Sequence, residues 1–168
     1  AHDDAHRLTA VAYPDGRSLH YTYDGLGRRT GMEDQDGFRI AYEYDTAGRL
    51  AAALTGARET LVSYTYDRSG RLAREERRNG TCTTYGYDAA GRLARLVHSA
   101  GDGTELARFA YGYDDAGRRA SVDTLEGTWQ YTYDGRSQLT DVVLPNGRTI
   151  QYAYDLAGNR TTVTADGA

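Results

Sequence analysis

Residues 42–50 read Tyr-Glu-Tyr-Asp-Thr-Ala-Gly-Arg-Leu, and this stretch decides the fold because the chain repeats it from end to end. The same Tyr-x-Tyr-Asp pattern begins again at positions 21, 64, 85, 111, 131 and 152. The motif aspartates lie 20 to 26 residues apart, most often 21. Residues 3–8, Asp-Asp-Ala-His-Arg-Leu, read as a degenerate copy with His6 in the glycine position. Self-similarity at this period predicts a repeat architecture, in which each unit packs mainly on its neighbours.

A second turn signal lies about halfway through each repeat. Asp-Gly or Asn-Gly occurs at residues 15–16, 36–37, 79–80, 146–147 and 166–167, and Glu126-Gly127 is a weaker copy. Such pairs between alternating runs favour hairpin turns, because the turn requires a positive φ angle. Each repeat therefore supplies two strands and two tight turns. This predicts an all-β antiparallel hairpin meander of about fifteen strands, without a substantial helix.

Alternation along the strands assigns their faces. Positions 38, 40, 42 and 44 are Phe, Ile, Tyr and Tyr on one face, and the residues between them fall on the other. After the motif arginine the alternation is less regular. Leu50, Ala52 and Leu54 continue one face, whereas Leu72, Arg74 and Glu76 do not.

The whole chain, residues 1–168, is predicted to be one array of about seven repeats, with degenerate copies at 3–8 and 131–139 and a longer loop near 98–104. We expect the strip of strands to curl, because twisted open sheets rarely exceed about ten strands without curling or splitting. Neither end carries an atypical capping repeat, so both sheet edges would be open. We therefore expect the chain to be a fragment of a longer protein.

The motif residues are predicted to be structural. The aspartate opens a turn and accepts backbone N–H bonds, and the glycine supplies its left-handed position. The arginine can pair with that aspartate or stack on a tyrosine of the adjacent repeat, and the tyrosines form a cross-strand ladder. Seven recurrences favour this reading, because an active site is needed once and a turn is needed every time. The candidate residues are Tyr21, Tyr23, Asp24, Gly27, Arg28, Tyr42, Tyr44, Asp45, Gly48, Arg49, Tyr64, Tyr66, Asp67, Gly70, Arg71, Tyr85, Tyr87, Asp88, Gly91, Arg92, Tyr111, Tyr113, Asp114, Gly117, Arg118, Tyr131, Tyr133, Asp134, Tyr152, Tyr154, Asp155 and Gly158.

Composition excludes several classes of protein. The formal net charge is −4, which argues against a nucleic-acid-binding protein. No apolar run is long enough for a membrane-spanning helix, and a lone Cys82 excludes an internal disulfide. The four histidines show no ligand spacing, and no segment fits a known calcium loop. We predict no enzyme, no cofactor and no metal site.

The Tyr-x-Tyr-Asp-x-x-Gly-Arg-Leu unit resembles the YD repeat, also called the RHS repeat, over essentially the whole chain. This family occurs in bacterial RHS polymorphic toxins, in the B and C components of insecticidal toxin complexes and in animal teneurins. The resemblance implies a curling β-sheet that forms a hollow shell, which in the bacterial toxins encloses a C-terminal toxin polypeptide.

Two features depart from the family pattern. The sixth copy, residues 131–139, lacks both the glycine and the arginine in their positions. The family's terminal core motif, an Asp-Pro with a following Gly-Leu, is missing, and residues 155–158 are an ordinary repeat. Neither the cargo nor self-cleavage is therefore assigned to this chain.

The leading hypothesis is a non-enzymatic shell segment that protects a toxin or other cargo in a secreted or cell-surface bacterial protein. Its partners would be the remainder of the shell and the enclosed polypeptide. The first alternative is an extracellular adhesion or carbohydrate-binding surface made of tyrosine and arginine side chains. The second is a self-associating fibre, since open edges of identical repeats pair readily.

Overall fold

The computed structural model describes residues 1–166, and these form strands and turns without any helix. The first seven strands are β1 (Ala10–Ala12), β2 (Ser18–Tyr23), β3 (Arg29–Asp34), β4 (Arg39–Tyr44), β5 (Leu50–Thr55), β6 (Thr60–Tyr66) and β7 (Leu72–Arg77). The next eight are β8 (Cys82–Tyr87), β9 (Leu93–Ser99), β10 (Glu105–Tyr113), β11 (Arg119–Thr124), β12 (Gly127–Tyr133), β13 (Leu139–Val143), β14 (Thr149–Tyr154) and β15 (Arg160–Ala165).

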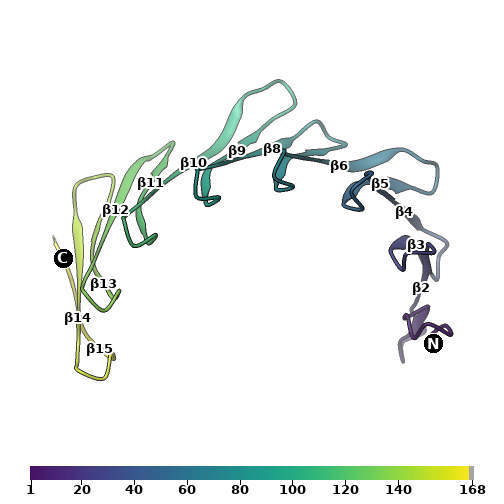
Figure 1. The fold of residues 1–168 in the computed structure, drawn as a ribbon, viewed down its shortest axis with the longest axis horizontal. Coiled ribbons are helices and arrows are strands. Elements are labelled where there is room, and N and C mark those ends of the chain that lie inside the picture. The colour runs from purple at the N-terminus through teal and green to yellow at the C-terminus, as the bar shows by residue number, and fades with distance from the viewer. Residues whose placement is uncertain (167–168) are drawn as a thin grey trace. The chain divides into compact units, whose positions relative to one another are not determined.

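Strand pairing follows the order of the chain, so that the fifteen strands form one open sheet. Figure 1 shows the resulting run of hairpins. The chain divides into two compact units, the first from Ala1 to Cys82 and the second from Thr83 onward. Within each unit every strand pairs antiparallel with the next one. The predicted antiparallel meander of about fifteen strands is confirmed.

A β-bulge recurs where the second strand of a repeat begins. Tyr44 pairs with Leu50, but the preceding residue Glu43 pairs with Ala52, so Ala51 is an extra residue. The same shift occurs in the other hairpins that contain a motif turn and whose registers are resolved. A bulge places two residues opposite one and reverses the alternation of faces beyond it.

The bulge overturns the predicted faces of β5. Ala53 pairs with Tyr42 and lies with Leu50 on the tyrosine face, whereas Ala52 and Leu54 lie on the opposite face. The expectation that Leu50, Ala52 and Leu54 share one face was wrong, because it assumed unbroken alternation. In β7 the same shift places Glu75 opposite Tyr64.

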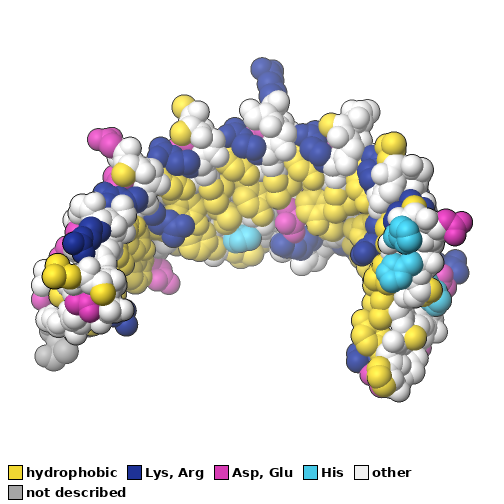
Figure 2. Space-filling model, turned by 60° about the horizontal axis from the view of Figure 1, so that its bottom comes forward, with side chains coloured by type: hydrophobic (Ala, Val, Ile, Leu, Met, Phe, Trp, Pro, Cys, Tyr) yellow, Lys and Arg dark blue, Asp and Glu magenta, His cyan; other side chains and the backbone are white. Residues whose placement is uncertain are grey.

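The core is thin because the sheet is a single layer. About half of the described residues are half-buried and nearly all the others are exposed. The buried apolar residues are Ala53, Leu54, Cys82, Val97, Val122 and Val142. Val122 shows how burial arises, since it pairs with Tyr111 on one side and Trp129 on the other. A small residue between two aromatic neighbours is thus covered without a second layer. Figure 2 shows hydrophobic side chains gathered in a band on one face, with arginines along its border.

Candidate functional site

The motif aspartate organises its own turn. In the second repeat, Oδ1 of Asp45 accepts the backbone N–H groups of Ala47 and Arg49, both at 2.9 Å. The N–H of Gly48 donates to the carbonyl of Asp45 at 2.9 Å, and Gly48 has a φ of 80°. The side chain therefore satisfies donors that the tight turn leaves without strand partners.

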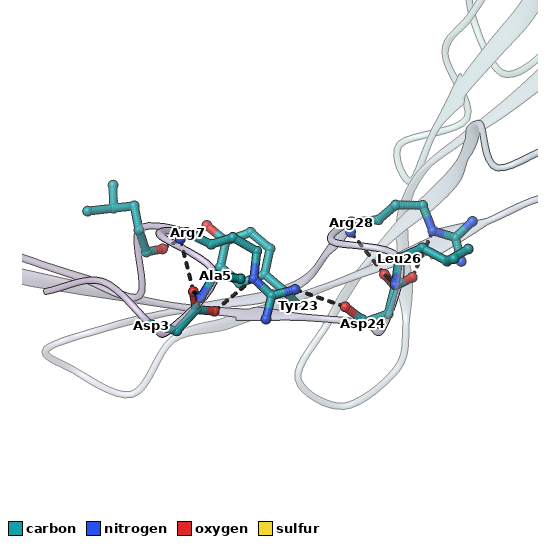
Figure 3. A network of polar contacts seen from close by, with 8 residues as sticks. Asp3, Ala5, Arg7, Tyr23, Asp24, Leu26 and Arg28 are labelled. Atoms are coloured by element: carbon teal, nitrogen blue, oxygen red, sulfur yellow. Dashed lines mark hydrogen bonds and ion pairs between the residues drawn. The ribbon is translucent and has the colours of Figure 1, made fainter.

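The motif arginine binds the same aspartate. Nε of the arginine donates to the second carboxylate oxygen at 2.7 Å in six turns, those of Asp3, Asp24, Asp45, Asp67, Asp88 and Asp114. Hydrogen bonds between two charged groups are shorter and stronger than neutral ones. Figure 3 shows two successive turns of this kind, with Asp3 bound to Arg7 and Asp24 bound to Arg28.

The same guanidinium also contacts the next repeat. The guanidinium carbon of Arg49 lies 4.3 Å from the ring centre of Tyr66. Four further arginines stack on the following repeat at 4.4–4.9 Å, namely Arg7 on Tyr23, Arg28 on Tyr44, Arg92 on Tyr113 and Arg118 on Tyr133. Sequence analysis offered pairing or stacking as alternatives, and these arginines do both. We call this arrangement of aspartate, arginine and following tyrosine the clamp.

The stacked tyrosine is tied to the preceding repeat through its hydroxyl as well. The hydroxyl of Tyr66 donates to the backbone carbonyl of Leu50 at 2.7 Å. The equivalent bond is present at Tyr23, Tyr44, Tyr113, Tyr133 and Tyr154. At Tyr23, Tyr44, Tyr66, Tyr113 and Tyr133 the second tyrosine of the pair both stacks on a guanidinium and donates a hydrogen bond across the repeat boundary. The first tyrosine of the pair lies on the same face of the same strand.

The family model for the RHS repeat matches residues 2–39, 66–105 and 133–168. The chain belongs to the RHS repeat family. The motif aspartates inside these matches are Asp3, Asp24, Asp67, Asp88, Asp134 and Asp155. A comparison with the curated proteins found no match.

Solved structures share the fold of this RHS repeat chain. A crystal structure of TcdB2-TccC3 gives a TM-score of 0.82 at 19% identity, covering 99% of this chain and 11% of that one. The TcdB2-TccC3-Cdc42 crystal structure gives 0.79 at 23% identity, over 92% and 9% of the two chains. The Tc holotoxin pore of Photorhabdus luminescens gives 0.78 at 23% identity, over 91% and 9%. This chain therefore spans about a tenth of the length of these neighbours.

Two RHS turns deviate from the motif and keep its backbone. His6 in the degenerate copy at residues 3–8 has a φ of 58°, and Ser137 in the sixth copy has a φ of 64°. The left-handed position is thus retained without glycine. In the sixth copy Gln138 replaces the clamp arginine, and its backbone N–H still donates to Oδ1 of Asp134 at 2.9 Å. In the seventh copy Asn159 donates to Oδ2 of Asp155 at 3.0 Å.

Sequence analysis missed a second set of stacked arginines. In three RHS repeats arginine stands in the position of the motif leucine. These residues stack on the first tyrosine of their own repeat, as Arg29 does on Tyr21 at 4.3 Å, Arg119 on Tyr111 at 4.9 Å and Arg160 on Tyr152 at 5.7 Å. The double arginines at 28–29 and 118–119 were the available signal. The second arginine of each pair lies on the tyrosine face, because Arg29 pairs with Tyr23 and Arg119 pairs with Tyr113.

Among residues 1–166, no three His, Cys, Asp or Glu side chains come together as a metal site would require. That part of the chain also holds no helix with the length and apolar character needed to cross a membrane. His20 is exposed and Cys82 is buried.

The clamps make the stability of the folded protein depend on pH, and the direction follows from the pKa shifts of their aspartates. The pKa of Asp45 is lowered from 3.8 by the side-chain hydrogen bond and then the backbone hydrogen bond from Arg49. The pKa of Asp88 is lowered in the same way by Arg92. A lowered folded-state pKa stabilises the protein where the carboxylate is ionised, and that contribution disappears as the pH falls through the folded-state pKa. The pKa values of Asp3, Asp24, Asp67 and Asp114 are lowered too.

We therefore expect the thermal midpoint to vary little between about pH 7 and 5 and to fall steeply below about pH 4. Thermal melts across this range, followed by circular dichroism at 218 nm, measure the effect. Asp45→Asn removes one titrating clamp, so its curve should be lower at neutral pH and should converge on the wild-type curve in acid. Curves that stay parallel down to the lowest pH would show that the clamps do not contribute.

Proposed function

We propose that this chain is a non-enzymatic segment of an RHS-type shell that encloses and protects a toxin or other cargo polypeptide within a secreted bacterial protein. One observation carries the proposal. The tyrosine face is half-buried along the sheet although no second layer covers it among residues 1–166, and stacked arginines and tyrosine hydroxyls join successive repeats along the chain. A wall needs this kind of continuity, whereas an enzyme needs one convergent site.

The solved neighbours support the same proposal at the level of the fold. One of them is the Tc holotoxin pore of Photorhabdus luminescens, and another is TcdB2-TccC3-Cdc42. The remainder of such a shell would supply the strands that continue the sheet on either side of this segment. The mechanism proposed here is mechanical, because a continuous hydrogen-bonded sheet excludes solvent and proteases from whatever lies behind it.

The test is protease protection in the full-length protein that carries this chain. Arg49→Ala removes the ion pair with Asp45 and the stack on Tyr66 in one change. The matched control is Arg74→Ala, because Arg74 is exposed and pairs only with Glu76 on the face away from the tyrosines. We expect Arg49→Ala to speed digestion of the enclosed polypeptide severalfold, with Arg74→Ala close to wild type.

Two results would contradict the proposal. One is digestion of the cargo at the same rate in wild type and in Arg49→Ala, although thermal denaturation shows that Arg49→Ala destabilises the sheet. The other is a folded tyrosine variant with intact cargo protection and abolished binding to a glycan array, which would favour an adhesive surface.

A further inference from the structure

Wherever the clamp is complete, the same kinds of group surround the space between two successive repeats. It has a carboxylate at one end, a tyrosine ring as its floor and the left-handed residue of the next turn at its far end, which is a glycine except for Ser137 beside Arg118. In the second repeat Arg49 fills it, bound to Asp45, stacked on Tyr66 and close to Gly70. A Cβ atom built at Gly70 would lie 3.4 Å from Nη1 of Arg49. A planar guanidinium fits this place because it pairs with a carboxylate and stacks on an aromatic ring at once.

The place between the sixth and seventh repeats lacks its arginine. Gln138 stands there, and its Nε2 lies 3.2 Å from the position of a Cβ at Gly158, so it reaches the same end of the site. Oδ1 of Asp134 accepts two backbone N–H groups, from Arg136 and Gln138. Within residues 1–166, no cation pairs with Asp134 and no guanidinium stacks on Tyr154, in contrast to the five stacked clamps.

The missing arginine leaves a hollow. It has a volume of about 600 Å³, and its lining includes Asp134, Gln138, Tyr154 and Asp155. Arg136 also lines it, with Nη1 donating to the carbonyl of Leu156 at 3.0 Å. Two carboxylates against one arginine leave the hollow with a net negative charge. The backbone around it is the same as elsewhere, because the Tyr154 hydroxyl still donates to the carbonyl of Leu139 at 2.9 Å.

We propose that this hollow binds a guanidinium group, supplied by an arginine side chain of another polypeptide. Five equivalent places in this chain already hold a guanidinium between the same three groups. Oδ2 of Asp134 is the acceptor for the guanidinium and the ring of Tyr154 is its stacking surface. The neutral Gln138 side chain moves aside as the arginine enters. The inference does not depend on the proposed function, because it concerns only the chemistry of this junction.

The first test is titration of the 168-residue chain with N-acetyl-arginine amide, followed by NMR shifts of Tyr154 and Gly158. We expect saturable binding to the wild type. Asp134→Asn should weaken it about tenfold, as the loss of a hydrogen bond between charged groups does. Gln138→Arg should abolish it, because the chain then supplies the guanidinium itself. The lysine analogue serves as the control and should bind more weakly, since an ammonium group neither stacks on an aromatic ring nor forms two parallel hydrogen bonds with a carboxylate.

The second test creates the site where the clamp is complete. Arg92→Gln should open an equivalent place between Asp88 and Tyr113, so that this variant gains a second binding event with shifts at Tyr113. Gln138→Arg is expected to fold at least as well as wild type, which keeps the test decisive if Asp134→Asn unfolds. Absence of binding to the wild type would overturn the proposal. Equal binding to wild type and to Gln138→Arg would also overturn it. Binding that appears only after Arg136→Gln would overturn it too, because Arg136 would then already occupy the hollow.

Discussion

Tyr66→Ala is expected to lower the free energy of unfolding by roughly 2–4 kcal/mol, the range for loss of a large aromatic side chain that is only partly buried. Three contacts disappear together. The hydroxyl no longer donates to the carbonyl of Leu50, the guanidinium of Arg49 loses its stacking surface, and Leu72 loses its cross-strand partner. Because neighbouring repeats share this interface, the loss affects both of them.

Urea denaturation of wild type and variant measures this change. The matched control is Tyr66→Phe, which keeps the ring and should cost about 1 kcal/mol for the lost hydrogen bond. Tyr154→Ala should cost less than Tyr66→Ala, because no arginine stacks on Tyr154 among the described residues and its partner strand β15 is exposed throughout. Equal losses in the free energy of unfolding for Tyr66→Ala and Tyr154→Ala would show that the stacked arginine does not add to the stabilisation by the tyrosine ring.

Gly48→Val is expected to cost roughly 1–3 kcal/mol, because a β-branched residue is strained at positive φ. Gly48 has a φ of 80°, and Gly70 and Gly91 have φ values of 82° and 83°, so the same cost applies to all three. A Cβ at Gly48 would also lie 3.5 Å from Nη1 of Arg28, the clamp arginine of the preceding repeat. The substitution therefore strains one turn and crowds the clamp beside it.

Two controls separate these causes, and denaturation midpoints compare all the variants. Gly25 lies in an equivalent turn without a positive φ, and nothing lies within 4 Å of a Cβ built there, so Gly25→Val should have little effect. Ser137 already carries a Cβ at a φ of 64°, so Ser137→Val should cost less than Gly48→Val. A large effect at Gly25 would place the cost in the β-branched side chain within the turn rather than in the left-handed backbone.

Much of the fold was predictable because its determinants are local. The turn at Asp45 needs an acceptor, a left-handed residue and nothing distant, so its sequence indicates its structure directly. The Asp-Gly and Asn-Gly turns follow the same logic, and Gly37 and Gly80 have φ values of 81° and 82°. Strand number and antiparallel order follow from the alternation of these two kinds of turn.

The candidate site was predictable only in part. Sequence analysis identified the aspartate, arginine and tyrosine of each clamp but left open whether the arginine pairs within its repeat or stacks on the next one. Side-chain reach decides this question, since one guanidinium spans from Asp45 to Tyr66. The second arginine set was missed because Arg29 stacks diagonally across the strand pair on Tyr21, two residues from its register partner Tyr23.

The sequence by itself determined the period, the turns, the strand count and the repeat family, all of which depend on residues close together in the chain. The tertiary structure alone decided the register, the faces beyond each bulge, the double role of the clamp arginines and the hollow at Gln138. The physical reason is that these features depend on hydrogen bonds between strands and on side chains that cross from one repeat to the next. One extra residue such as Ala51 leaves the local pattern almost unchanged, yet it reverses every face that follows.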